Sequence, residues 1–282
     1  QIVLVSGLVL SCGKLIATIS GKWYPVILAI PLVYSSFFVL GFYNFIFGLI
    51  LYFFFLDFLL QKESFDWKGI KEWGLLFFVF GLIYFSHFFV FGITCVSILV
   101  ILILKNRRNF RDGMLYFSPA IPFVLMGLIF ILSNSQSSDY SEVFYFARFY
   151  DFFHGSPLVG YHDMEYTFVT PFISMVALLC GISLYRFQWE ALKNGSKRTH
   201  ILGITGLLLL SCFIVFPNSN GWSGYIADRF GYVAITLFTI LAASSILKIS
   251  KIFQFIILSI VLLLSVKLSL YYVDSNKTFQ QN

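Results

Sequence analysis

The side chains best suited to acid–base or metal chemistry gather in one polar stretch, residues 133–166. Its formal charge is −4, because it holds five acids and one arginine, Arg148. Imidazole and carboxylate groups can hold a divalent cation, and a carboxylate can act as general base for an acceptor hydroxyl. We therefore predict catalytic roles for three carboxylates and substrate-binding roles for Arg148 and two histidines. The five acid and histidine candidates fall within 15 residues: Asp151, His154, His162, Asp163 and Glu165.

The spacing of these histidines and carboxylates matches no defined metal-ligand motif. A solvated amphipathic loop with aromatic residues at the membrane interface accounts for the same residue types. The divalent cation is therefore one hypothesis for residues 133–166, and a solvated loop is the alternative.

A second candidate site is the segment 217–229, which joins a Gly-, Asn- and Ser-rich turn to Arg229 at the start of an apolar run. Backbone amides at a helix N-terminus and a guanidinium can together hold a phosphate. We predict that Arg229 binds such a group. In the alternative interpretation, Arg229 is an interfacial anchor paired with Asp228.

Two further polar residues interrupt apolar segments. His87 is flanked by phenylalanines, and a polar ring at membrane depth is costly unless it has a partner or a cavity. We predict that His87 lines the catalytic pocket, with a neutral imidazole capping a turn as the alternative. Asn44 is a candidate for substrate binding, although it could simply cap the helix that starts there.

The positioning elements follow from the composition, in which 59% of the 282 residues are hydrophobic and only 11% are charged. A soluble domain carries about 25% charged residues, so this class is excluded. No basic stripe interleaved with exposed aromatics is visible, and a nucleic-acid partner is not expected. The four cysteines lie far apart in apolar runs, without the paired spacing of a zinc site or disulfide framework, and are interpreted as packing residues.

Uninterrupted apolar runs favour helices over a barrel, and each crossing needs about 20 residues. We predict an all-α polytopic bundle of about 8–10 transmembrane helices, forming a single domain over residues 1–282. The run 73–104 is too long for one comfortable crossing and should fold back near Ser86 and His87 as a short hairpin. The remaining runs are 1–19, 23–40, 42–60, 114–132, 167–185, 200–216, 231–247 and 252–272.

Basic residues collect on the cytoplasmic side of membrane proteins. Alternating the spans between the basic clusters puts residues 133–166 outside, together with the turns at 41–44 and 86–87 and the segment 217–229. We therefore expect one extracytoplasmic site in an integral protein of a bacterial inner membrane, and an N-terminal part upstream of Gln1. The five clusters are Lys14 and Lys22; Lys62, Lys68 and Lys71; 105–111; 186–198; and Lys248 and Lys251.

Three segments carry a family resemblance: Gly-Phe-Tyr-Asn-Phe at 41–45, Tyr-Phe-Ser-His at 84–87, and the segment 217–229. Together they resemble the C-type multi-spanning glycosyltransferases, which use polyprenyl-phosphate sugar donors at the outer leaflet. The resemblance implies sugar transfer to an acceptor at the outer membrane face, with loop carboxylates as base or metal ligands and basic residues on the lipid phosphate. The large external loop that usually carries the key acid is absent after the first span, so either it lies upstream or the likeness is one of architecture.

Two other classes of function fit the same sequence. A non-catalytic membrane subunit would use the outer loop to dock a protein partner. A transporter would use proline-interrupted spans and a midplane histidine, but paired broken helices in two related halves are not evident.

Overall fold

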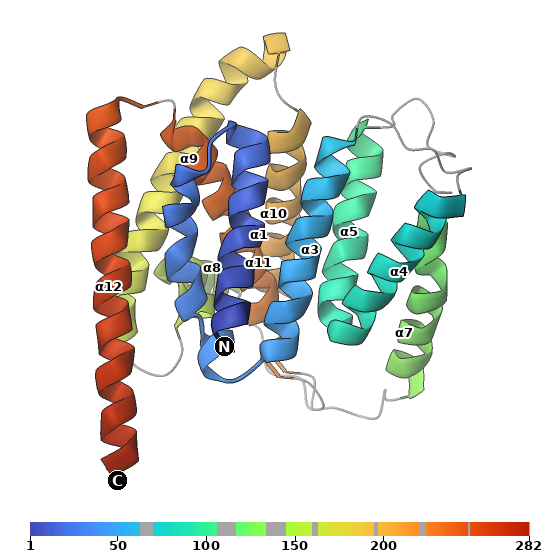
Figure 1. Ribbon diagram of the computed structural model, residues 1–282, viewed down its shortest axis with the longest axis horizontal. Helices are drawn as coiled ribbons and strands as arrows, with labels where there is room; N and C mark the ends of the chain where they lie inside the picture. Colours follow the sequence, from blue (N-terminus) through green and yellow to red (C-terminus); the bar gives the residue numbers. More distant parts are fainter. Residues whose placement is uncertain are drawn as a thin grey trace.

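In the part of the chain that it describes, the computed structural model consists of helices and their connections, with no strand (Figure 1). The described residues are 1–62, 70–105, 117–133, 145–159, 163–194, 197–219, 224–247 and 249–281. The α-helices are α1 (Ile2–Ser20), α2 (Ser36–Val39), α3 (Tyr43–Gln61), α4 (Ile70–Ser86), α5 (Phe88–Lys105), α7 (Ile121–Ser133), α8 (Tyr145–His154), α9 (Tyr166–Asn194), α10 (Lys197–Val215), α11 (Ile226–Ile246) and α12 (Lys251–Gln281). Four 3₁₀ helices join them: η1 (Tyr24–Tyr34), η2 (Ser118–Ala120), η3 (Ser156–Leu158) and η4 (Asp163–Glu165).

Five of these helices are long and apolar enough to cross a membrane: α1, α3, α10, α11 and α12. Shorter apolar helices add to them, including η1 and most of α5. Lipid offers the backbone no hydrogen-bond partners, so each segment must satisfy its own N–H and C=O groups, as a helix does. The chain is therefore an all-α polytopic membrane protein, which confirms the predicted fold class.

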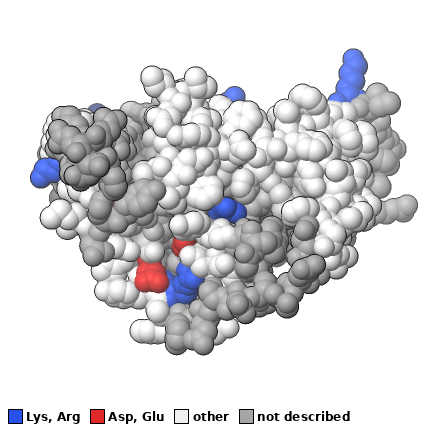
Figure 2. Space-filling model, turned by 90° about the horizontal axis from the view of Figure 1, so that it is seen from below, with Lys and Arg blue, Asp and Glu red and all other residues white. Residues whose placement is uncertain are grey.

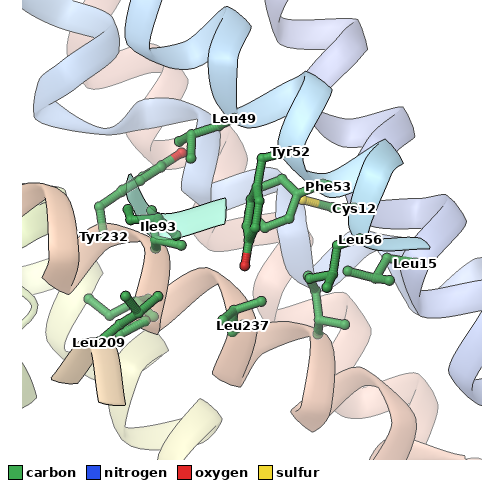
Figure 3. Close-up of a cluster of buried hydrophobic side chains, with 14 of the residues drawn as sticks. Cys12, Leu15, Leu49, Tyr52, Phe53, Leu56, Ile93, Leu209, Tyr232 and Leu237 are labelled. Atoms are coloured by element: carbon green, nitrogen blue, oxygen red, sulfur yellow. The ribbon is translucent and has the colours of Figure 1, made fainter. Parts of the chain in front are cut away.

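Helix α11 forms the centre of the bundle and packs against α1, α9, α10 and η1. Figure 3 shows side chains of α1, α3 and α11 meeting in a shared apolar core, with Cys12 among them. Two tyrosine hydroxyls inside this core have partners, since Tyr52 bonds to Ser97 at 2.9 Å and Tyr232 donates to the Leu32 carbonyl at 2.9 Å. These two buried hydroxyls are thus satisfied, as low-dielectric surroundings require.

The predicted second span differs from the expected α-helix. Residues 24–34 form the 3₁₀ helix η1, which breaks at Ser35 before the short helix α2. Pro25 stands at its start and Pro31 inside it. Proline has no N–H to donate and its ring clashes with the preceding turn, which disfavours continuous α-helix.

The predicted hairpin in the run 73–104 is confirmed. Helix α4 ends at Ser86 and α5 begins at Phe88, so that His87 alone separates them. The two helices meet at the lower end of the bundle in Figure 1 and diverge toward the upper end.

The stretch 133–166 is more ordered than the loop that we predicted. Its described part contains α8, η3 and η4, and α8 packs against α9 and α10. Gly155 ends α8 with a φ of 82°, a left-handed conformation that glycine adopts without the steric cost of a Cβ. A Cβ there would lie 2.3 Å from the Val169 side chain, so the turn also packs tightly on α9.

Candidate functional site: an arginine framed by aromatic rings

The site lies at the lower end of the bundle in Figure 1, where the 41–44 turn, the α4–α5 turn, α8 and the start of α11 come together. Figure 2 views this end and shows red and blue side chains side by side within a largely white face. The predicted gathering of these segments on one face is therefore confirmed.

Arg229 is in the first turn of α11 and is only 8% exposed. Its guanidinium carbon lies 5.4 Å from the ring centre of Phe42, 5.9 Å from that of Phe45 and 5.7 Å from that of Phe89. The three rings belong to the turn before α3, to α3 itself and to α5. Such distances allow cation–π attraction, which offsets part of the cost of burying the charge.

No acidic side chain among the described residues lies within ion-pair distance of Arg229, and its buried Nε has no hydrogen-bond partner. Arg229 therefore forms no ion pair with Asp228, contrary to the pairing in the alternative interpretation, although the two charges interact. A buried cation normally has an anion or several acceptors beside it. Arg229 thus has hydrogen-bonding and charge capacity that this part of the protein does not use.

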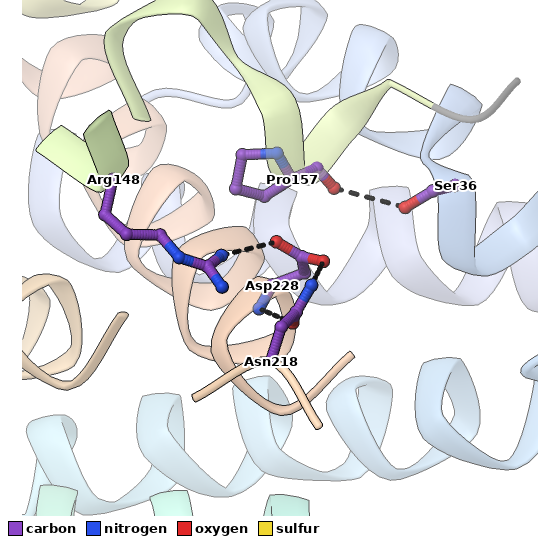
Figure 4. Close-up of polar contacts among 5 residues, drawn as sticks. All are labelled: Ser36, Arg148, Pro157, Asn218 and Asp228. Carbon is purple, nitrogen blue, oxygen red and sulfur yellow. Dashed lines mark hydrogen bonds and ion pairs between the residues drawn. The ribbon is translucent and has the colours of Figure 1, made fainter. Parts of the chain in front are cut away.

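The carboxylate of Asp228 has other partners, as Figure 4 shows. Its Oδ2 accepts a 2.7 Å hydrogen bond from Asn218, and its Oδ1 lies 3.8 Å from the Arg148 guanidinium on α8. The Asp228 backbone N–H also donates to Asn218 Oδ1 at 3.3 Å. This cluster of Arg148, Asn218 and Asp228 joins α8, the segment before α11 and the start of α11.

A further contact holds this part of the chain in place. The hydroxyl of Ser36 on α2 donates to the Pro157 carbonyl of η3 at 3.3 Å (Figure 4). The segment that follows α8 is therefore bonded to the turn region that supplies Phe42.

His87 lies in the turn between α4 and α5, with its ring centre 5.3 Å from that of Phe45. Its Nδ1 is buried without a hydrogen-bond partner, so this nitrogen does not cap the turn as the alternative interpretation required. His87 is outside both helices, and burial together with the positive charge of Arg229 lowers the pKa of His87 to about 4. The imidazole is therefore neutral at pH 7 and can donate or accept a hydrogen bond.

The acids and histidines of 133–166 whose side chains are described, Asp151, His154 and Glu165, do not form one cluster. Asp151 on α8 is near enough to Asp228 for their charges to interact. His154 instead packs between aromatic rings, 4.2 Å from Tyr150 and 6.1 Å from Tyr166. Among the members of this set whose side chains the structure describes, only Asp151 and Arg148 are thus tied by contacts or charge to the Arg229 region.

Glu165 lies elsewhere at this end of the bundle. It is 1% exposed and hydrogen-bonds the Tyr272 hydroxyl of α12. The rings of Tyr272 and Tyr34 stack at 6.0 Å, and the Tyr34 hydroxyl bonds to Ser269. Since α12 and α5 lie on opposite sides of the bundle in Figure 1, Glu165 belongs to a different group from the residues around Arg229.

The remaining candidates have simpler outcomes. Asn44 is exposed in the first turn of α3, and the N-cap is Phe42 without a side-chain cap bond, so the capping alternative is wrong. His162 lies outside the described residues. Asp163 is within η4, but its side chain is not described.

In the described parts of the chain no three His, Cys, Asp or Glu side chains are grouped as a metal site would need, and the divalent cation stays a prediction.

Sequence reasoning missed the roles of Asn218 and the three phenylalanines. Asn218 follows Pro217 in the turn-rich segment, but no spacing rule predicts which side chain it will hold. The phenylalanines are 3 of 36 in the chain, so their type alone carries no signal. Their convergence on Arg229 is a product of helix packing.

This end of the bundle thus offers a buried guanidinium with no ion pair to a described acid, a neutral imidazole and a carboxylate on α8 nearby. Together with the fold, these features define an integral, polytopic helical membrane protein with an anion-binding candidate site at one end. No family model, curated protein or solved structure matches the chain.

Proposed function

We propose that this membrane protein binds the phosphate of a polyprenyl-phosphate sugar at Arg229 and transfers the sugar to an acceptor hydroxyl. The observation that carries the proposal is the guanidinium of Arg229, buried among three aromatic rings without an ion pair to any acid among the described residues. A phosphate oxygen can accept charge-assisted hydrogen bonds from a guanidinium. The isoprenoid chain of such a donor would lie in the bilayer beside the apolar helices.

The chemical step needs a base for the acceptor. The acceptor oxygen forms a bond to the anomeric carbon, the bond from that carbon to the phosphate oxygen breaks, and the polyprenyl phosphate leaves with the electron pair. The hydroxyl proton goes to a carboxylate. Asp151 is our candidate base, because it is the predicted acid whose charge acts on the Asp228 side chain next to Arg229. The neutral His87 would supply a hydrogen bond beside Arg229.

Binding is tested with the purified full chain in detergent micelles, using farnesyl phosphate as a short polyprenyl phosphate and farnesol as the uncharged control. Loss of a charge-assisted hydrogen bond costs about 1.5–3 kcal/mol, so Arg229→Gln should weaken farnesyl phosphate binding by about tenfold or more. Arg198→Gln is the matched control, since Arg198 donates to the Thr18 carbonyl at the other end of the bundle. Equal binding by wild type and Arg229→Gln would overturn the assignment.

Transfer is tested in proteoliposomes with a panel of polyprenyl-phosphate sugars. Asp151→Asn should abolish transfer and keep farnesyl phosphate binding, whereas Arg229→Gln should reduce both. Binding without transfer of any sugar in the panel would instead favour a non-catalytic lipid-binding subunit.

We further propose that residues 133–166 and the Arg229 end face the outside of a bacterial inner membrane. The support is the bias of basic residues toward the other end. Single cysteines at Ser138 and Lys197, in a background without native cysteines, test it with a membrane-impermeant reagent. Labelling at position 138 is expected, and labelling at 197 instead would reverse the orientation.

A further inference from the structure

Arg148, Asp228 and Arg229 lie close together at the anion-binding candidate site, but Asp228 pairs with only one of the two arginines. Asp228 and Arg229 are adjacent in α11, and their charges interact. Even so, the Asp228 carboxylate is bound to Arg148 and Asn218 rather than to Arg229. The side chains of Arg148 and Asp228 are each 15% exposed, so water screens their interaction only in part.

We infer that Arg148 is a positioning residue, which neutralises and holds Asp228 so that Arg229 stays available to a phosphate group. The inference rests on the proposed function and adds to it the interaction that keeps Asp228 from pairing with Arg229. It also changes the role of Arg148 from the ligand contact predicted from the sequence to a partner of Asp228.

The physical reason is the position of a carboxylate beside an anion site. Without Arg148, the Asp228 carboxylate would keep its hydrogen bond from Asn218, and among the described residues Arg229 would be the remaining cation whose charge acts on it. That carboxylate would compete for the guanidinium and repel an incoming phosphate. At an effective dielectric constant of about 20, one unit charge several ångströms away changes binding by about ten- to a hundredfold.

The packing around Arg148 also fits this role. Its guanidinium lies 5.6 Å from the ring centre of Phe213 on α10, which fixes one face of the group. The α8 helix that carries it is held by Gly155 against α9 and by η3 against α2. Arg148 is thus directed to Asp228 from a well-anchored element.

The experiment compares farnesyl phosphate binding by four forms of the full chain in detergent: wild type, Arg148→Gln, Asp228→Asn and the double variant. We expect Arg148→Gln to weaken binding about tenfold. The affinity of Asp228→Asn should be within about threefold of the wild-type affinity, or higher, since the substitution removes the competing charge. In the double variant, binding should return to within about threefold of wild type.

The double variant separates the alternatives. If Arg148 contacts the ligand directly, or acts only by packing α8, Asp228→Asn should change binding by the same factor with and without Arg148, and that result overturns the inference. The unfolding midpoint of each variant in mixed micelles shows whether a loss of binding reflects a loss of fold, and a double variant that is less stable but binds well would support the charge role.

The two proposals fail in different ways. Wild type that does not bind farnesyl phosphate, or that binds it equally after Arg229→Gln, overturns the proposed function and the inference with it. Wild type that binds and depends on Arg229, together with an Arg148→Gln variant that binds normally, overturns the inference alone.

Discussion

The two ends of the bundle treat their charged side chains differently. At the upper end in Figure 1, Lys62 after α3 and Glu72 on α4 form an ion pair at 2.5 Å, and Asp57 accepts a 2.7 Å hydrogen bond from Gln61. At the lower end Arg148 pairs with Asp228, whereas Arg229 is surrounded by aromatic rings. A cation that forms an ion pair with an acid on another helix joins the two helices. A cation without such an ion pair is available to a ligand.

The cost of each arrangement supports this distinction. The Lys62 and Glu72 side chains are 24% and 33% exposed, so solvent stabilises both ions and their pair contributes little, about 1 kcal/mol or less. Arg229 at 8% exposure has lost most of its hydration. Its three ring contacts stabilise the buried guanidinium by about 0.5–2 kcal/mol each, and a bound anion would add to this stabilisation.

The largest effect should come from Gly155→Ala, which tests whether the lower end depends on the anchoring of α8. The added Cβ would meet Val169 at 2.3 Å in a backbone conformation with φ of 82°. Strain and overpacking together should lower the free energy of unfolding by about 2–5 kcal/mol, measured by SDS titration in mixed micelles. Farnesyl phosphate binding should weaken as well, because Arg148 moves with α8.

Gly41→Ala is its matched control, because Gly41 has a similar φ of 78° but nothing within 4 Å of a Cβ. Only the backbone cost of about 1–2 kcal/mol is expected there. Equal losses for both variants would show that the packing of Gly155 on α9 is unimportant.

Next in size is the opposite-end comparison. Lys62→Gln should lower the free energy of unfolding by about 1 kcal/mol or less, because it leaves Glu72 without its partner, and it should leave farnesyl phosphate binding unchanged. Arg229→Gln should instead weaken farnesyl phosphate binding, and it leaves no acid without its ion-pair partner. A Lys62→Gln variant that binds poorly would break the distinction between the two ends.

The last effect concerns pH. The pKa of His87 is lowered to about 4 by burial and Arg229, whereas an unfolded histidine has a pKa of about 6.5. The unfolded chain therefore binds more protons between these values, and stability should fall as pH is lowered through that window. His87→Phe keeps an aromatic ring and should show a smaller fall in unfolding midpoint between pH 7 and pH 5. Identical pH dependence in both proteins would contradict this assignment.

Sequence reasoning succeeded where one physical requirement dominated. The hairpin break at His87 followed from the length of the apolar run, and the gathering of the polar turns at one end followed from alternating spans. Sequence reasoning failed where local geometry competed with the apolar pattern. In residues 24–34, prolines disfavour a regular α-helix, and the chain forms the 3₁₀ helix η1 instead. Sequence reasoning also treated 133–166 as a loop, because a short amphipathic helix such as α8 does not stand out by hydropathy.

The candidate site was predictable only in part. Arg229, His87, Arg148 and Asp151 were chosen from their residue types and positions, and the structure relates them by contact or charge. Glu165 was chosen on the same grounds and lies with α12 instead. A short separation along the chain does not ensure proximity, since one turn of backbone can direct neighbouring side chains to different helices.

By itself, the sequence determined that this protein is a helical bundle in a membrane. Its apolar composition cannot be covered by water, and a backbone in lipid must close its own hydrogen bonds. Only the tertiary structure decided that Asp228 pairs with Arg148, 80 positions away, and not with the adjacent Arg229. The reason is that the anchored α8 brings a second guanidinium to the carboxylate, while the phenylalanines of α3, α5 and the turn before α3 surround Arg229.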